Sequence, residues 1–338
     1  MSTLAHDLRL PALVLLGALL AAGCSKSPTK PTDTSVAPQI TCPVAPASTV
    51  SLDGISAFIS YGSPTVVGGK APVLTNCTPV SGNFFPVGSS TVTCTATDAL
   101  SRAASCGFSV VVTRSPTIAF TKFVAFGDSI TWGENGVDLS AFLAGSSGPY
   151  SEQILPHFRL PDVQQYPAQL QQKLAQRYVS QASSIEVRNR GVQGESAALA
   201  VGRFSTDITG FQAVLLMEGA NDLGNIGAGL NGLKQMVGIA KSRGIGVYLA
   251  TLPPEEEATA PPRRGKPLET MQMNDGIRVL AFVEGVTLVD VFQAFPPGNL
   301  IGQGLLSSDG LHPTGAGYTI IADKFFQVLR ATLDTTPP

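Results

Sequence analysis

The sequence predicts an α/β domain built on a parallel β-sheet, preceded by a small all-β domain. Three observations support this architecture, namely the length, the hydrophobic content and the change of pattern along the chain. The chain has 338 residues, more than one average domain, and 43% of them are hydrophobic, enough for a sizeable core. Residues 39–113 are rich in β-forming residues and turn signals, whereas beyond residue 117 short apolar runs alternate with helical patterns. The formal net charge of −2 indicates neither a nucleic-acid partner nor an anionic membrane surface.

The N-terminus has the pattern of an export signal. Arg9 precedes the apolar run Leu10–Ala22, which is too short to span a bilayer and is typical of a signal-peptide core. The run leads into Leu20-Ala21-Ala22-Gly23-Cys24, which resembles the bacterial lipobox. This resemblance implies that residues 1–23 are a lipoprotein signal peptide and that Cys24 carries a diacylglyceryl anchor. An ordinary cleaved signal or a short anchor helix is the alternative.

Residues 24–38 form the expected lipidated tether. They are rich in Ser, Thr, Pro and Lys and have no apolar periodicity, so they cannot build a core. We therefore expect an exported lipoprotein, held at a membrane by its lipid in the bacterial periplasm or at the cell surface.

Residues 39–113 have the pattern of a β-sandwich. Thr91–Thr97 is dominated by β-formers, and Cys106, Phe108, Val110 and Val112 alternate with small or branched residues, as in a half-buried strand. Gly, Pro and Asn interrupt the segment at short intervals.

This segment resembles a HYR (hyalin repeat) domain, an immunoglobulin-like module. The matching stretches are Ile40–Pro43, Ser81–Gly88, Thr95–Asp98 and Ser105–Val110. The resemblance implies a disulfide-braced extracellular spacer or adhesion module without chemistry of its own, which could contact a surface or a carbohydrate.

The cysteines agree with export. With Cys24 assigned to the lipid, the other four of the five cysteines are Cys42, Cys77, Cys94 and Cys106. An even set within a short segment of an exported chain indicates disulfides. Four cysteines allow three pairings, and the sequence alone does not choose among them. We favour Cys77–Cys94 and Cys42–Cys106.

A second domain is expected over residues 118–332, after a short linker at Arg114–Thr117. Strands are predicted near Lys122–Phe126, Ile185–Asn189, Ala213–Met217, Gly246–Thr251 and Val286–Val289, and helices near Tyr166–Tyr178, Leu230–Ser242, Thr270–Phe282 and Ala316–Leu329. This alternation predicts a parallel sheet covered by helices on both faces.

Ser129 is a candidate nucleophile. Sites in open parallel sheets form beyond the carboxyl ends of the strands, and a buried strand runs directly into Phe126-Gly127-Asp128-Ser129-Ile130-Thr131. A serine hydroxyl needs a base to become a good nucleophile. Because Asp and Ser are also preferred helix caps, this motif alone does not decide between the two roles.

His312 is the candidate base. Of the three histidines, His6 lies in the signal segment and His157 lies between prolines, remote from any predicted strand end. His312 lies in Asp309-Gly310-Leu311-His312-Pro313, where the Asp309 carboxylate can accept the imidazole N–H and fix its tautomer. A surface turn with a capping Asp is the alternative.

Two more motifs follow strands and contain candidate hydrogen-bond donors to an oxyanion. Gly219-Ala220-Asn221-Asp222 offers the side-chain amide of Asn221, and Asn189–Ser196 offers main-chain N–H groups near Gly194. Taken singly, each is also a plausible turn.

The ordered set of Ser129, Gly194, Asn221, Asp309 and His312 resembles the SGNH hydrolases, also called the GDSL family, over roughly Phe123 to Arg330. The resemblance implies a flavodoxin-like three-layer fold. It also implies Ser129 as nucleophile, His312 as general base and Asp309 as its orienting carboxylate. The implied oxyanion hole consists of the main-chain N–H groups of Ser129 and Gly194 and the side chain of Asn221.

The expected activity is therefore hydrolysis of lipid, short-acyl or acetylated-carbohydrate esters through an acyl-enzyme. No cofactor and no metal are expected, since neither metal-ligand clusters nor the glycine-rich phosphate and dinucleotide motifs occur. An acyltransferase using the same triad, or a surface-binding protein with a silent hydrolase domain, is the alternative.

Outside these motifs, the stretch Glu134–Gln164 is long for a strand–helix connection, which leaves the substrate pocket undefined. Trp132, Phe142 and Leu143 are candidate acyl-pocket residues, with exposed apolar packing as the alternative. Glu255–Glu257 is expected to be a solvated loop.

Overall fold

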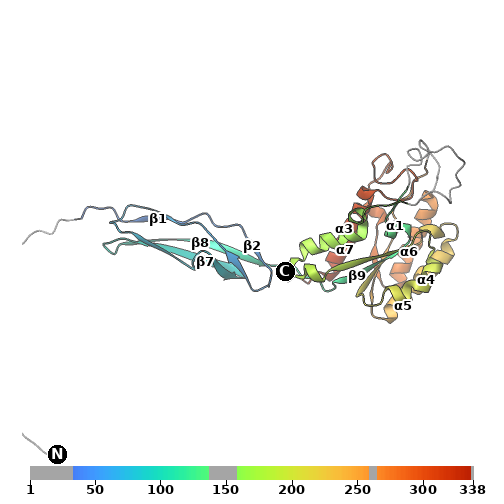
Figure 1. Cartoon of the computed structure of the whole chain (residues 1–338), viewed down its shortest axis with the longest axis horizontal. Coiled ribbons are helices and arrows are strands. Elements are labelled where there is room, and N and C mark those ends of the chain that lie inside the picture. The colour runs from blue at the N-terminus through green and yellow to red at the C-terminus, as the bar shows by residue number, and fades with distance from the viewer. Residues whose placement is uncertain (1–32, 137–157, 259–264, 336–338) are drawn as a thin grey trace, which may run out of the picture.

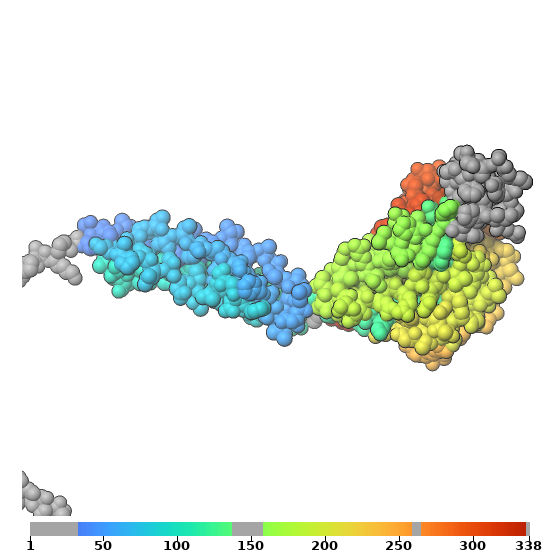
Figure 2. Space-filling model, in the orientation of Figure 1, coloured from blue at the N-terminus to red at the C-terminus, as the bar shows by residue number. Residues whose placement is uncertain are grey.

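The computed structural model describes residues 33–136, 158–258 and 265–335. Over these ranges the chain forms an all-β part followed by an α/β part, drawn as two bodies in Figures 1 and 2. The predicted fold class is thus confirmed. The signal segment and Cys24 lie outside the described residues. Within those ranges, no helix combines the length and apolarity needed to cross a bilayer.

The all-β part has eight strands within the described residues. They are β1 (Gln39–Thr41), β2 (Thr49–Ser51), β3 (Ser56–Ile59), β4 (Thr65–Val67), β5 (Leu74–Thr78), β6 (Asn83–Pro86), β7 (Gly88–Thr97) and β8 (Ala103–Arg114). They pair as a four-stranded sheet in the order β2-β8-β7-β5 and as the two-stranded pairs β1-β4 and β3-β6. Alternate residues such as Val92, Cys94, Val110 and Val112 are buried, so these strands contribute one face each to a small core.

Two disulfides cross-link this part of the chain. Cys42, just after β1, is bonded to Cys106 on β8, and Cys77 on β5 is bonded to its register partner Cys94 on β7. These are the two pairings favoured from the sequence. The first joins positions 64 residues apart and the second positions 17 residues apart, and such cross-links compensate for the small size of the core.

The α/β part is built on a five-stranded parallel sheet. Its strands are β9 (Lys122–Gly127), β12 (Glu186–Gly191), β13 (Ala213–Met217), β14 (Gly246–Ala250) and β15 (Thr287–Val289). Their order across the sheet is β12-β9-β13-β14-β15. Numbered within the domain, this is the flavodoxin-like order 2-1-3-4-5, whose switch point lies between the first and third strands.

Helices cover both faces of this sheet (Figure 1). One face carries α3 (Tyr166–Arg177) and α7 (Gly315–Leu333), and the other carries α4 (Ala197–Asp207), α5 (Ile226–Ser242) and α6 (Pro267–Glu284). The short elements are α1 (Ser129–Trp132), the strand pair β10 (Glu134–Asn135) and β11 (Phe158–Arg159), and the 3₁₀ turns η2 (Asp162–Gln164), η3 (Val179–Ser184), η4 (Ala220–Asp222) and η5 (Phe292–Ala294). The sheet and its helices form the predicted three layers.

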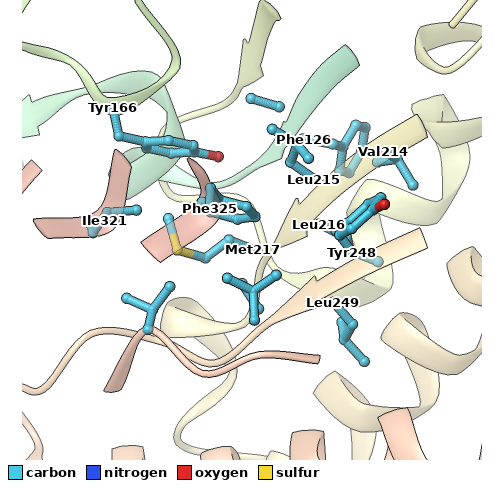
Figure 3. Close-up of a cluster of buried hydrophobic side chains, with 14 of the residues drawn as sticks. Phe126, Tyr166, Val214, Leu215, Leu216, Met217, Tyr248, Leu249, Ile321 and Phe325 are labelled. Atoms are coloured by element: carbon cyan, nitrogen blue, oxygen red, sulfur yellow. The ribbon is translucent and has the colours of Figure 1, made fainter. Parts of the chain in front are cut away.

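The central strands are apolar throughout because both faces of the sheet are buried under helices. All five residues of β13 are buried, because helices pack on both sides of it. On the α3–α7 face, the rings of Tyr166 and Phe325 stack with centroids 5.4 Å apart, and Figure 3 shows them beside Met217 of β13. A rigid sheet therefore supports the loops that follow its strands.

Candidate active site

Ser129 is the first residue of α1 and is separated from the end of β9 by Asp128 alone. A Cβ atom at Gly127 would lie 1.9 Å from the carbonyl oxygen of Met217, so only glycine fits where β9 meets β13. Asp128 caps α1 by accepting a hydrogen bond from the N–H of Ile130 at 3.0 Å, and it also accepts one from the N–H of Ala220 at 3.1 Å. The capping role weighed from the sequence thus belongs to Asp128, and it fixes the position of Ser129.

Ser129, His312 and Asp309 form a continuous hydrogen-bonded chain. The Ser129 Oγ lies 2.9 Å from His312 Nε2, and His312 Nδ1 lies 2.6 Å from Asp309 Oδ2. All three residues are buried, with 4%, 1% and 1% of their surface exposed, respectively. Interactions between charges are stronger in such a site than in water.

Asp309 is held in place by further donors. Its Oδ1 accepts hydrogen bonds from the Ser307 hydroxyl at 2.7 Å and from the N–H groups of Leu311 and His312 at 2.9 Å. Burial alone would raise the pKa of this carboxyl, but the hydrogen bonds from His312 and Leu311 and the charge of His312 outweigh it and lower the pKa to about 2. Asp309 is therefore an anion at neutral pH.

The segment Glu255–Glu257 supports the loop that carries Asp309 and His312. The N–H of Glu256 donates to the Gly310 carbonyl at 2.8 Å, and its carboxylate accepts from the N–H groups of Leu300 and Ile301 at 2.6 and 3.0 Å. Glu255 is buried, which raises its pKa to about 7, and it accepts a hydrogen bond from the N–H of Lys266. The expectation of a solvated loop is therefore wrong for Glu255 and Glu256, because both carboxyls bind main-chain N–H groups; only Glu257 is exposed.

Gly194 lies between β12 and α4. Its φ is +65°, and nothing lies within 4 Å of the position a Cβ would take. Backbone conformation, not crowding, is therefore the reason for glycine here.

Asn221 lies in η4, after β13, and is exposed. Its Nδ2 donates a hydrogen bond to the main-chain carbonyl of Glu195 at 2.9 Å. The side chain of Asn221 is thereby tied to the turn that contains Gly194.

The structure brings all four sequence motifs together. The N–H of Val192 donates to the Gly127 carbonyl at 2.9 Å, which joins the motif around Gly194 to the one before Ser129. The hydrogen bond from the Ala220 N–H to Asp128 joins the motif around Asn221 to the motif that contains Ser129. The contact between Ser129 and His312 joins the Asp309–Pro313 motif to the same group. Each of the four motifs thus contacts at least one other at the carboxyl end of the sheet, near its switch point.

Arg203 of α4 is a supporting residue that sequence reasoning missed. Its Nε donates to both carboxylate oxygens of Glu195 at 3.0 and 2.8 Å, and its Nη2 donates to the Gly127 carbonyl at 3.2 Å. The guanidinium also lies 4.0 Å from the centroid of the Phe126 ring. Arg203 therefore connects the end of β9 to the turn after Gly194.

Glu134 is a second residue that was missed. Its carboxylate is buried, and Oε2 lies 3.6 Å from His312 Nε2. Glu134 lies three residues beyond the motif that contains Ser129, but no sequence pattern indicates that its side chain approaches His312.

Trp132 is half-buried, and Arg159 stacks over its ring at 5.4 Å while donating to its carbonyl at 2.8 Å. Of the long stretch Glu134–Gln164, residues 137–157 lie outside the described residues. The candidate pocket residues Phe142 and Leu143 fall among them.

A Ser–His–Asp hydrogen-bonded chain at the switch point of a flavodoxin-like sheet is the arrangement that serine hydrolases use. Residues 125–320 match the model of the GDSL-like lipase/acylhydrolase family, and the chain belongs to this family. It is accordingly a carboxylic ester hydrolase. Residues 32–112 match the HYR domain model.

Several solved structures are similar to part of this chain. An aryl esterase from M. smegmatis is similar with a TM-score of 0.50 and 17% identity, covering 62% of this chain and 98% of that one. A carbohydrate acetylesterase from Sinorhizobium meliloti is similar with a TM-score of 0.48 and 16% identity, again covering 62% and 98%. A GDSL-like lipase from Bacteroides thetaiotaomicron has a TM-score of 0.44 and 20% identity, covering 63% and 89%. A search of the curated proteins finds no match.

Proposed function

We propose that this protein is an exported, lipid-anchored serine esterase that cleaves carboxylic esters through an acyl-enzyme on Ser129. The observation that carries the mechanism is the hydrogen-bonded chain from Ser129 Oγ to His312 Nε2 at 2.9 Å and from His312 Nδ1 to Asp309 Oδ2 at 2.6 Å. This arrangement supplies a nucleophile, a base and a carboxylate that orients the base.

In the acylation step, Ser129 Oγ forms a bond to the ester carbonyl carbon while its proton passes to His312 Nε2. The carbonyl electron pair moves onto oxygen and gives an oxyanion. When this intermediate collapses, the bond to the alkoxy oxygen breaks, and the alcohol leaves with the proton from His312. Asp309, an anion at neutral pH, stabilises the imidazolium that forms in between.

In the deacylation step, His312 takes a proton from water as the water oxygen bonds to the acyl carbon. Collapse of the second oxyanion breaks the bond to Ser129 Oγ, which recovers its proton from His312. The products are a carboxylic acid and the free enzyme.

Three donors are proposed for the oxyanion, namely the main-chain N–H groups of Ser129 and Gly194 and the side-chain amide of Asn221. The contact of Asn221 with the Glu195 carbonyl supports its part in this role. An amide group carries two N–H donors, so one that is bonded to Glu195 leaves the other for the substrate. Gly194 has no side chain, and nothing lies within 4 Å of the position a Cβ would take, which gives a substrate access to its main-chain N–H.

Hydrolysis of p-nitrophenyl esters from acetate to palmitate tests this function. The full-length chain in mild detergent is compared with Ser129→Ala and His312→Ala. We expect turnover of at least one ester to fall about 10⁴-fold or more in each variant. Equal turnover by the wild type and Ser129→Ala would contradict the proposal. Adding an acceptor alcohol separates an esterase from an acyltransferase, since only the latter yields mainly a new ester.

The proposed export and anchoring rest on the lipobox-like sequence ending in Cys24 and on the two disulfides, which form in oxidising compartments. The HYR part is proposed to hold the esterase away from the membrane and to contact a surface or a carbohydrate. Metabolic labelling with an alkyne fatty acid tests the anchor, and we expect the label to be lost in Cys24→Ser. A label that persists would contradict lipidation at Cys24.

A further inference from the structure

Glu134 is a buried carboxylate next to the catalytic histidine that the proposed mechanism does not use. It is 3% exposed, and its Oε2 lies 3.6 Å from His312 Nε2. Burial of a carboxylate carries a large desolvation cost unless it is paired or hydrogen-bonded. Its position beside the reacting nitrogen therefore calls for a functional explanation.

The surroundings of Glu134 fix its position. Gln193 Nε2 donates to Oε2 at 3.1 Å, and the Tyr318 hydroxyl donates to the main-chain carbonyl at 2.6 Å. The residue also pairs with Arg159 in the β10–β11 ladder. The side chain and the main chain of Glu134 are thus both held by described neighbours.

The imidazole of His312 is flanked by a carboxylate at each nitrogen. Asp309 Oδ2 lies 2.6 Å from Nδ1, and Glu134 Oε2 lies 3.6 Å from Nε2. Ser129 Oγ, at 2.9 Å, is closer to Nε2 than Glu134 is. Serine therefore keeps the hydrogen bond to Nε2, and Glu134 acts on the ring through its charge.

We propose that Glu134 is a second acidic partner of His312, a positioning residue that holds the imidazole ring and stabilises its protonated form during acyl transfer. The proposal rests on the proposed role of His312 as the base. It turns the three-residue chain into a four-residue system in which negative charge acts on both sides of the ring. A neutral isostere at residue 134 would make the imidazolium less stable and the transfer of the serine proton less favourable.

Other acidic groups also face His312. Asp309 lies on its own loop, Asp128 follows β9, and Glu255 lies in the segment after β14; the charge of His312 acts on all three. Burial raises the pKa of Asp128 to about 6 and that of Glu255 to about 7, so both titrate in the range of a histidine. The dependence of activity on pH would report the combined titration of His312 and these acidic groups. The imidazole of His312 must therefore be observed directly.

The test is an NMR titration of the His312 imidazole in the full-length chain and in Glu134→Gln, with the resonance assigned by its loss in His312→Asn. We expect the titration midpoint of His312 to fall by about one pH unit in Glu134→Gln, because an adjacent carboxylate raises a histidine pKa by about that much. We also expect kcat on p-nitrophenyl acetate to fall about 3- to 10-fold, with KM little changed and the acid limb of the profile moved to lower pH.

The matched control is Glu186→Gln. Glu186 starts β12, at the opposite end of the sheet from the site, and pairs with Arg188. This variant should leave both the midpoint and kcat unchanged. Glu134→Asp keeps the charge and should keep the midpoint closer to the wild-type value than Glu134→Gln does, which separates a charge effect from a loss of folding.

A His312 midpoint that is the same in the wild type and Glu134→Gln would overturn the inference. This result differs from failure of the proposed function. If Ser129→Ala remained fully active, the mechanism would fail, whereas the NMR titration would still report whether Glu134 acts on His312.

Discussion

The side-chain amide of Asn221 donates to the main-chain carbonyl of Glu195 at 2.9 Å, which ties the loop after β13 to the turn after β12. This contact orients the amide before any substrate arrives. Donors that are already oriented need no reorganisation when charge develops on the carbonyl oxygen.

Replacing Asn221 with Ala removes that donor. Because Asn221 is exposed, we expect little loss of stability, but kcat on p-nitrophenyl acetate should fall about 100- to 1,000-fold. Stopped-flow assays with a thermal melt on the same sample measure both effects. A fall in kcat of less than threefold would remove Asn221 from the proposed oxyanion hole.

Glu255 makes stability depend on pH. Burial raises its folded-state pKa to about 7 from the ordinary 4.5, so the folded protein binds this proton more tightly than the unfolded chain does. The resulting stability is fully present below pH 4.5 and is lost as the pH rises through about 7.

Glu255→Gln should remove this contribution while keeping an acceptor for the Lys266 N–H. Urea titrations between pH 4.5 and 8 should show the wild type losing on the order of 2–3 kcal/mol relative to the variant. Parallel stability profiles for the two proteins would show that the Glu255 carboxyl does not titrate as described. Asp128 titrates in the same range in both proteins, and its charge contributes to the raised pKa of Glu255.

Gly127→Ala should prevent normal packing of the turn between β9 and Ser129. The added Cβ would lie 1.9 Å from the Met217 carbonyl oxygen, and neighbouring backbone cannot move aside easily. We expect a loss of at least about 3 kcal/mol, or insoluble protein.

Gly202→Ala is the matched control for this substitution. Gly202 lies within α4, and nothing lies within 4 Å of the position that a Cβ would take there, so alanine should leave the protein as stable or slightly more stable. Equal melting temperatures for both variants would contradict the close packing of β9 against β13.

The Cys42–Cys106 disulfide should stabilise the all-β part without affecting catalysis. It closes a sequence separation of 64 residues, and a double replacement with Ala should cost that part about 2–5 kcal/mol. The buried cluster of the all-β part is separate from that of the α/β part. Calorimetry should therefore show a lower melting temperature for one unfolding transition, while ester hydrolysis at 25 °C is unchanged. A loss of activity in the same variant would contradict the separation of the two clusters.

The parts of this fold that could be predicted from sequence are those in which local pattern and tertiary environment agree. Ala213–Met217 was predicted as a strand with its observed ends, since a short apolar run buried on both faces has few other placements. Helix α5 begins at Ile226, earlier than the predicted Leu230, because Asn225 caps it by accepting from the N–H of Ala228. That cap lies before the apolar periodicity begins.

The supporting residues of the site were not predictable in the same way. Glu134 and Arg203 act through partners at sequence separations of 178 and 76 residues, and no periodic pattern encodes such contacts. Glu255 and Glu256 were misjudged because three adjacent acidic residues usually face solvent. Here main-chain N–H groups from Lys266, Leu300 and Ile301 bind their carboxyls.

Covalent labelling of Ser129 tests the central claim most directly. The full-length protein is treated with a fluorophosphonate, which phosphonylates an activated serine, and the labelled peptide is identified by mass spectrometry. We predict one adduct, on the peptide containing Ser129, that is absent in Ser129→Ala and strongly slowed in His312→Ala. Ester hydrolysis that persists without an adduct, or an adduct on another residue, would contradict the assignment of Ser129 as the nucleophile.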